Sequence, residues 1–139
     1  MSRKKDETKH KYISAVGRRR EAVARVRLYK GKGETVVNNQ PIEKYFPGKV
    51  MQISYQMPFE LTGTVGKYYA TVLVSGGGKS GQLQAVVYGL SRALALENKE
   101  KFRPILKKAN LLSFDARVRE RRKVGMGGKA RRKKQSPKR

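Results

Sequence analysis

The sequence contains no cysteine, no tryptophan and one histidine among its 139 residues. The absence of cysteine excludes disulfides, thiolate nucleophiles and sulfur-ligated zinc. The single imidazole, His10, stands among charged residues near the N-terminus, where a solvated side chain is expected more often than a metal ligand. We therefore expect no enzymatic activity, no metal site and no cofactor.

Long apolar runs are also missing. Hydrophobic residues make up 37% of the chain, which suffices for one modest core. Every apolar stretch is shorter than the roughly 20 residues that a membrane span requires, and residues 1–11 lack the apolar segment of a secretory signal. These absences predict a single domain, a cytoplasmic location and no membrane partner.

Negative charge is scarce, because 10 Asp and Glu stand against 34 Lys and Arg and the formal net charge is +24. Residues 115–139 hold 12 basic and 2 acidic residues, a net charge of +10. A segment that repels itself so strongly cannot bury enough apolar surface to fold alone. We expect a flexible basic N-terminal arm at 1–11, one α/β domain at 12–124, and an extended basic tail at 125–139 that orders on a partner.

Two segments alternate between apolar and cationic residues, as strands with one buried face do. In residues 22–29 the outward set carries Arg25 and Arg27, and residues 115–124 repeat the pattern. A turn at 30–33 predicts that residues 34–37 return beside the first strand as a hairpin. The outward face of the second strand would hold Arg117, Arg119, Arg121 and Lys123.

The middle of the chain predicts one further strand and several helices. Residues 68–75 are apolar on both faces and rich in β-branched and aromatic residues, which suits a central strand. Residues 82–97 carry the apolar stripe of a helix. Shorter helices are predicted at 41–45, at 50–56 with Pro58 as terminator, and at 99–109.

A glycine-rich loop followed by Lys79 and Ser80 joins the strand at 68–75 to the helix at 82–97. These are also the parts of a nucleotide-binding P-loop, but the position of its first glycine falls on Leu73, inside the strand. We therefore favour a tight turn, or a backbone approach to the phosphate of a larger polyanion, over an NTP-dependent enzyme. The candidate phosphate-approach residues are Gly76, Gly77 and Gly78.

Cationic side chains without acidic neighbours repel one another, and a nucleic acid relieves that repulsion and releases counterions. The chain has no zinc ligands, no heptads and no evident helix-turn-helix. Cationic strand faces and an extended tail suit an irregular RNA surface. A basic DNA-binding architectural or regulatory protein is the alternative.

Five motifs occur in order: GRRREAVARV at 17–26, NNQPIEKYF at 38–46, SGGGKSGQ at 75–82, GLSRAL at 89–94 and DARVRERRK at 115–123. Together they resemble the bacterial-type small-subunit ribosomal protein nine family. The resemblance implies an α+β fold, with a four-stranded mixed sheet, helices packed on one face as in the second domain of ribosomal protein five, and an extended basic C-terminal tail.

The same resemblance implies a structural constituent of the small ribosomal subunit. It implies binding to the 3′ (head) domain of the small-subunit rRNA, contact with neighbouring small-subunit ribosomal proteins, and a C-terminal tail that contacts peptidyl-site tRNA through Lys138 and Arg139. The family's aromatic residue just before the C-terminus is absent here, where the chain ends QSPKR. The expected rRNA-binding residues are Arg18, Arg19, Arg20, Arg25, Arg27, Lys79, Arg117, Arg119, Arg121, Lys123, Lys129, Arg131 and Arg132.

Overall fold

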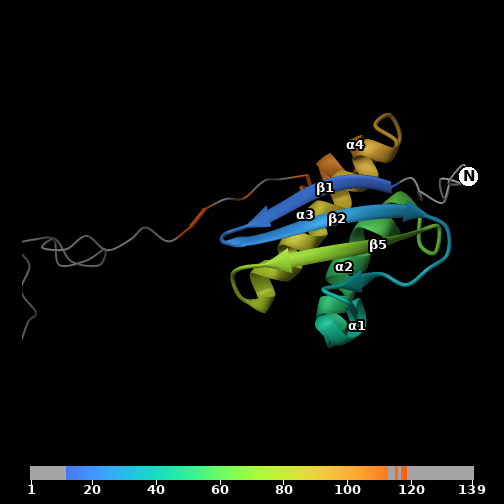
Figure 1. Cartoon of the computed structure of the whole chain (residues 1–139). Helices are drawn as coiled ribbons and strands as arrows, with labels where there is room; N and C mark the ends of the chain where they lie inside the picture. Colours follow the sequence, from blue (N-terminus) through green and yellow to red (C-terminus); the bar gives the residue numbers. More distant parts are fainter. Residues whose placement is uncertain (1–11, 113–114, 116, 119–139) are drawn as a thin grey trace, which may run out of the picture.

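The computed structural model describes residues 12–112, 115, 117 and 118 (Figure 1). Within this part, the strands are β1 (Tyr12–Arg19), β2 (Ala22–Lys30), β3 (Val36–Val37), β4 (Gln40–Pro41) and β5 (Tyr68–Ser75). The helices are α1 (Ile42–Tyr45), α2 (Lys49–Thr62), α3 (Lys79–Glu97) and α4 (Phe102–Lys108). None of these helices is long and apolar enough to cross a membrane.

The strands form one mixed sheet in the order β1-β2-β5-β3-β4. β2 pairs antiparallel with both β1 and β5, whereas β3 runs parallel to β5. The helices α2, α3 and α4 lie on one side of the sheet, so its other face is open (Figure 1). The predicted α+β class is confirmed; the sheet has five strands where four were implied, and β3 and β4 are two residues each.

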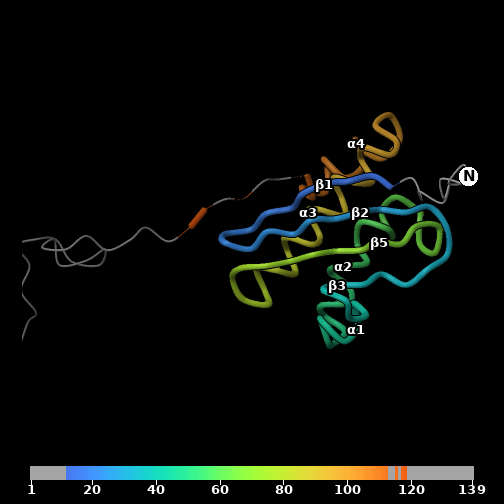
Figure 2. The backbone as a smooth tube through the Cα atoms, viewed as in Figure 1, coloured from blue at the N-terminus to red at the C-terminus, as the bar shows by residue number. Residues whose placement is uncertain are grey.

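The predicted hairpin between residues 22–29 and 34–37 is wrong. β3 pairs with β5 instead, and β2 lies between β5 and β1, a strand that the alternation of the sequence did not reveal (Figure 2). The reason lies in Asn38, whose side-chain amide donates to the carbonyl oxygen of Val74 at 2.9 Å and accepts from the Val74 N–H at 2.9 Å. This pair of bonds fixes the chain after β3 to β5.

The core lies between the sheet and α3. Ala22, Ala24, Val26 and Leu28 point inward from β2 as predicted, and α3 supplies its apolar stripe. β5 departs from the prediction, because only alternate residues are buried and Leu73 is 53% exposed on the open face. A central strand can carry apolar residues on both faces without being covered on both.

Two glycines allow α3 to lie directly against β1. A Cβ at Gly17 would overlap the carbonyl oxygen of Ala85 and the amide nitrogen of Gly89, and a Cβ at Gly89 would lie 2.6 Å from Val26 Cγ2. Arg92 on the same helix donates to the carbonyl oxygen of Val16 in β1 at 3.0 Å. The close crossing fixes the position of β1 over the core.

The prediction that Pro58 ends the second helix is also wrong, since α2 continues to Thr62. Pro58 is buried, and its ring forfeits one backbone hydrogen bond while the helix around it packs against the core. The helix ends at Gly63, which has a φ of 65°, and Thr62 Oγ1 donates to the Pro58 carbonyl oxygen at 2.8 Å. The packing of α2 against the core therefore outweighs the tendency of proline to end a helix.

Candidate nucleic-acid interface

Arg25 and Arg27 project from the open face of the sheet. The strand register places Arg27 between Ser14 and Thr71, and Arg25 between Val16 and Leu73. Both arginines are exposed. The open face of β1, β2 and β5 contains no Asp or Glu, so these guanidinium groups meet no opposite charge there.

A row of tyrosines crosses the same face. Tyr29 stacks on Tyr69, with 5.2 Å between ring centres and 13° between planes, and its other neighbour is Tyr12 at 5.7 Å. The guanidinium carbon of Arg27 lies 5.0 Å from the centre of the Tyr12 ring. The row therefore holds Arg27 by a cation–π contact and gives the cationic face an aromatic border.

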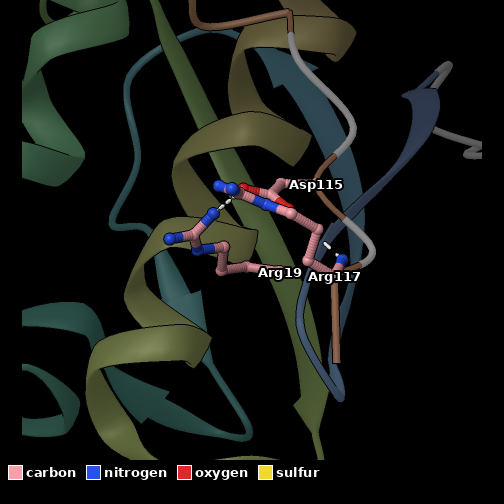
Figure 3. Close-up of polar contacts among 3 residues, drawn as sticks. All are labelled: Arg19, Asp115 and Arg117. Carbon is pink, nitrogen blue, oxygen red and sulfur yellow. Dashed lines mark hydrogen bonds and ion pairs between the residues drawn. The ribbon is translucent and has the colours of Figure 1, made fainter. Parts of the chain in front are cut away.

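A second cationic group gathers where the β1–β2 hairpin ends. Asp115 forms ion pairs with Arg19 and Arg117, the latter through two hydrogen bonds of 2.9 and 2.8 Å (Figure 3). The backbone N–H of Arg20 donates to the carbonyl oxygen of Asp115 at 3.1 Å. Arg20 adopts a φ of 55° to make this turn. One carboxylate thus joins the end of the hairpin to residues far along the chain.

The three arginines around Asp115 keep an excess of positive charge. A concavity of about 450 Å³ is lined by Arg19, Arg20, Arg117 and Val118. The side chain of Arg117 is 85% exposed although it is bonded to Asp115, whereas that of Arg19 is 20% exposed. Because two guanidinium groups share one carboxylate, this hollow can accept an oxyanion such as a phosphate.

The glycine-rich loop lies against the same hairpin end. Gly76 and Gly77 have φ values of 78° and 62°, and a Cβ at Gly76 would overlap the carbonyl oxygen of Glu21. The close approach at these two positions is therefore to the chain's own hairpin. Gly78 faces open space and precedes α3 without a side-chain cap, so first-turn N–H groups of α3 add positive potential beside the hairpin.

Lys79 is directed to another part of the fold. Its Nζ lies 3.4 Å from the centre of the Tyr45 ring and donates to the Tyr45 carbonyl oxygen at 3.2 Å. Tyr45 in turn donates from its hydroxyl to Gln82 Oε1 at 2.7 Å. The structure therefore joins Lys79 to α1 and does not bring it together with the arginines.

Several predicted site residues lie outside the described part of the chain: Arg119, Arg121, Lys123, Lys129, Arg131, Arg132, Lys138 and Arg139. The arm at 1–11 and the tail at 125–139 lie outside it too. Of the strand predicted at 115–124, the described residues show one parallel bridge, between Asp115 and Arg19. Sequence reasoning missed the role of Asp115, although an acidic residue opening a cationic run was an available signal.

A small α+β domain with a cationic sheet face and a cationic hairpin end is typical of a structural protein that binds a polyanion. The chain belongs to the family described as ribosomal protein S9/S16, whose model matches residues 17–139. The predicted family is thereby confirmed.

The relatives agree with this assignment. Small ribosomal subunit protein uS9 of Maridesulfovibrio salexigens is 52% identical over 114 residues, which are 82% of this chain and 87% of that protein. The protein of the same name from Bifidobacterium animalis is 49% identical over 123 residues, 88% of this chain and 75% of its own. The protein of the same name from Cutibacterium acnes is 45% identical over 113 residues, which are 81% of this chain and 65% of that protein.

Family membership decides the broad class of function. The chain is a structural ribosomal protein and not an enzyme, as predicted. Its place is the small ribosomal subunit, where it associates with rRNA and with other ribosomal proteins.

Proposed function

We propose that the chain binds and stabilises the 3′ (head) domain of the small-subunit rRNA. The observation that carries this proposal is the unbalanced positive charge of the open sheet face and the hairpin end. Arg25 and Arg27 stand on a face without acidic residues, and Asp115 is shared between two arginines. The motifs of the sequence and the names of the relatives support RNA over DNA as the polyanion.

Arginine suits this task because its planar guanidinium donates two parallel hydrogen bonds to a phosphate. The cation–π contact with Tyr12 restricts the motion of Arg27 before RNA arrives, so less side-chain entropy is lost on binding. Contacts with phosphates position a protein on RNA without reading its sequence. Specificity for the head domain then comes from the shape of the folded rRNA against the open face.

A binding titration tests the sheet face. Arg25→Gln/Arg27→Gln should weaken binding to a folded head-domain transcript and reduce the slope of log affinity against log salt by about 1.5, since each lost phosphate contact removes about 0.7–0.9. The matched control is Arg103→Gln/Lys107→Gln, which removes the same charge from exposed positions on α4. Equal losses in both variants, or tighter binding to duplex DNA at the same salt, would overturn the proposal.

We further propose that the C-terminal residues contact peptidyl-site tRNA. The support is the family motif and the terminal pair Lys138 and Arg139. Deleting this pair should lower tRNA retention by reconstituted small subunits while subunit assembly proceeds. The control removes an equal charge elsewhere, by Lys107→Gln/Lys108→Gln on α4. Unchanged tRNA affinity in the truncated subunits would contradict this part of the proposal.

A further inference from the structure

A groove of about 410 Å³ lies between α1, α2 and the loops that flank β3 and β5. We call it the acidic groove, because the two charged residues that line it are both glutamates. Its walls combine these carboxylates with aromatic and apolar side chains, among them Glu34, Glu43, Tyr55, Phe59, Val65 and Tyr68.

The charge of the acidic groove is opposite to that of the chain as a whole. No Lys or Arg lines it, and neither Glu34 nor Glu43 forms an ion pair with any described residue. Both glutamates are exposed. In a chain of net charge +24, two carboxylates that lack an ion pair to any described residue place negative charge on one groove, which favours a cation there over a phosphate.

Tyr55 is an independent observation at the groove, because it is a buried residue with an unpartnered polar group. The residue is 4% exposed, and its hydroxyl makes no hydrogen bond with the described residues. No side-chain nitrogen or oxygen in the described part is sealed from solvent without a partner, so the Tyr55 hydroxyl reaches the groove. Burial, and then the charge of Glu43, raise the pKa of Tyr55, as expected for a neutral hydroxyl near that carboxylate.

These groups together match the side chain of lysine or arginine. Carboxylates accept charge-assisted hydrogen bonds from an ammonium or guanidinium group, and the faces of tyrosine and phenylalanine attract a cation. A free hydroxyl supplies one more acceptor. We infer that the acidic groove binds a basic side chain from an extended segment of a neighbouring protein of the small subunit.

Exposed apolar side chains, in the groove and elsewhere on α2, favour a protein as the partner. Val65, which lines the groove, is 64% exposed, and α2 exposes Val50 at 80% and Ile53 at 59%. Apolar side chains of this kind gain free energy by burial against another protein and offer nothing to phosphates. No arginine of the sheet face or hairpin end lines the groove, so binding at the groove can be tested separately from the proposed rRNA binding.

Photocrosslinking in assembled particles tests the inference. The full-length chain carries a benzophenone amino acid at Gln56, which lines the groove, and is incorporated into reconstituted small subunits. The expected product is a crosslink to another ribosomal protein, mapped by mass spectrometry to a segment containing Lys or Arg. Glu34→Gln/Glu43→Gln should lower the crosslinking yield about three- to tenfold, since an exposed ion pair changes an equilibrium up to about fivefold.

The matched control is Glu60→Gln/Glu100→Gln, which makes the same charge change at exposed positions outside the groove and should leave the yield unchanged. Tyr55→Phe removes only the hydroxyl and should lower the yield about twofold or more. Melting temperatures and affinity for the head-domain transcript, measured on each variant, should equal those of the parent. A crosslink to rRNA, a crosslink to residues 1–11 of the same chain, no crosslink, or equal losses in variant and control would each overturn the inference.

Discussion

Replacing Gly17 by alanine should destabilise the fold strongly, because the added methyl group enters the contact between β1 and α3. It would overlap two backbone atoms, the carbonyl oxygen of Ala85 and the amide nitrogen of Gly89, and approach Gly89 Cα to 2.9 Å. A backbone atom cannot rotate away as the end of a flexible side chain can. The helix and the strand must therefore separate.

The cost follows from the packing that this separation disturbs. A gap of about 0.5–1 Å forfeits a quarter to a half of the dispersion energy of each contact along the crossing, and the crossing includes the fully buried Val86 and Leu90. Overpacking of a core costs about 1–3 kcal/mol. We expect the upper end, about 3 kcal/mol, which lowers the melting temperature of a domain of this size by about 12–24 °C.

Thermal and urea unfolding, followed by circular dichroism, measure this loss. Gly78→Ala is the matched control, because it adds the same methyl group where no atom lies within 4 Å and the φ is −95°. The control should remain within about 0.5 kcal/mol of the parent. Equal stability of the two variants would refute the close packing of α3 on β1.

Two further predictions concern charge. Burial, and then Glu97, raise the pKa of Tyr68, and the pKa of Tyr55 is raised as well, above the ordinary value of 10.0. Ionisation of these two phenols therefore costs the folded state stability. The free energy of unfolding should then fall as the pH rises above about 10, and Tyr55→Phe/Tyr68→Phe should flatten that fall in urea titrations between about pH 8 and 11. Asp115→Ala should cost about 1–2 kcal/mol, because it leaves the mostly buried Arg19 without its carboxylate. Glu100→Ala, at an exposed position without an ion pair to any described residue, should cost less than about 0.5 kcal/mol in the same melts. An equal cost in both variants would contradict the role given to Asp115.

The parts of the fold that could be predicted are those in which local periodicity coincides with burial. β2 alternates cleanly because only one of its faces is covered, and the apolar stripe of α3 matches the face that packs on the sheet. β1 could not be predicted, since small residues such as Ser14 and Gly17 hide its alternation. The pairing of β3 with β5 depends on Asn38, a contact across 36 residues that no local pattern contains.

The candidate site also has a part that local sequence patterns predict and a part that they do not. The sequence identified Arg25 and Arg27 as outward-facing because their strand was readable. It could not foresee that Lys79 lies on Tyr45, or that Asp115 pairs with Arg19, because each of these contacts joins residues distant in the chain. The acidic groove is likewise assembled from separate loops and helices. Non-local geometry decides which charged residues act together.

The two edges of the sheet also bear on how the chain behaves before it reaches its subunit. A long unpaired edge strand invites another copy to add to it and start aggregation. Here one edge ends in the two-residue strand β4, and at the other edge Arg92 occupies the carbonyl oxygen of Val16 while Asp115 bridges to Arg19. These features shorten the stretch of unpaired backbone to which a newly made copy could add.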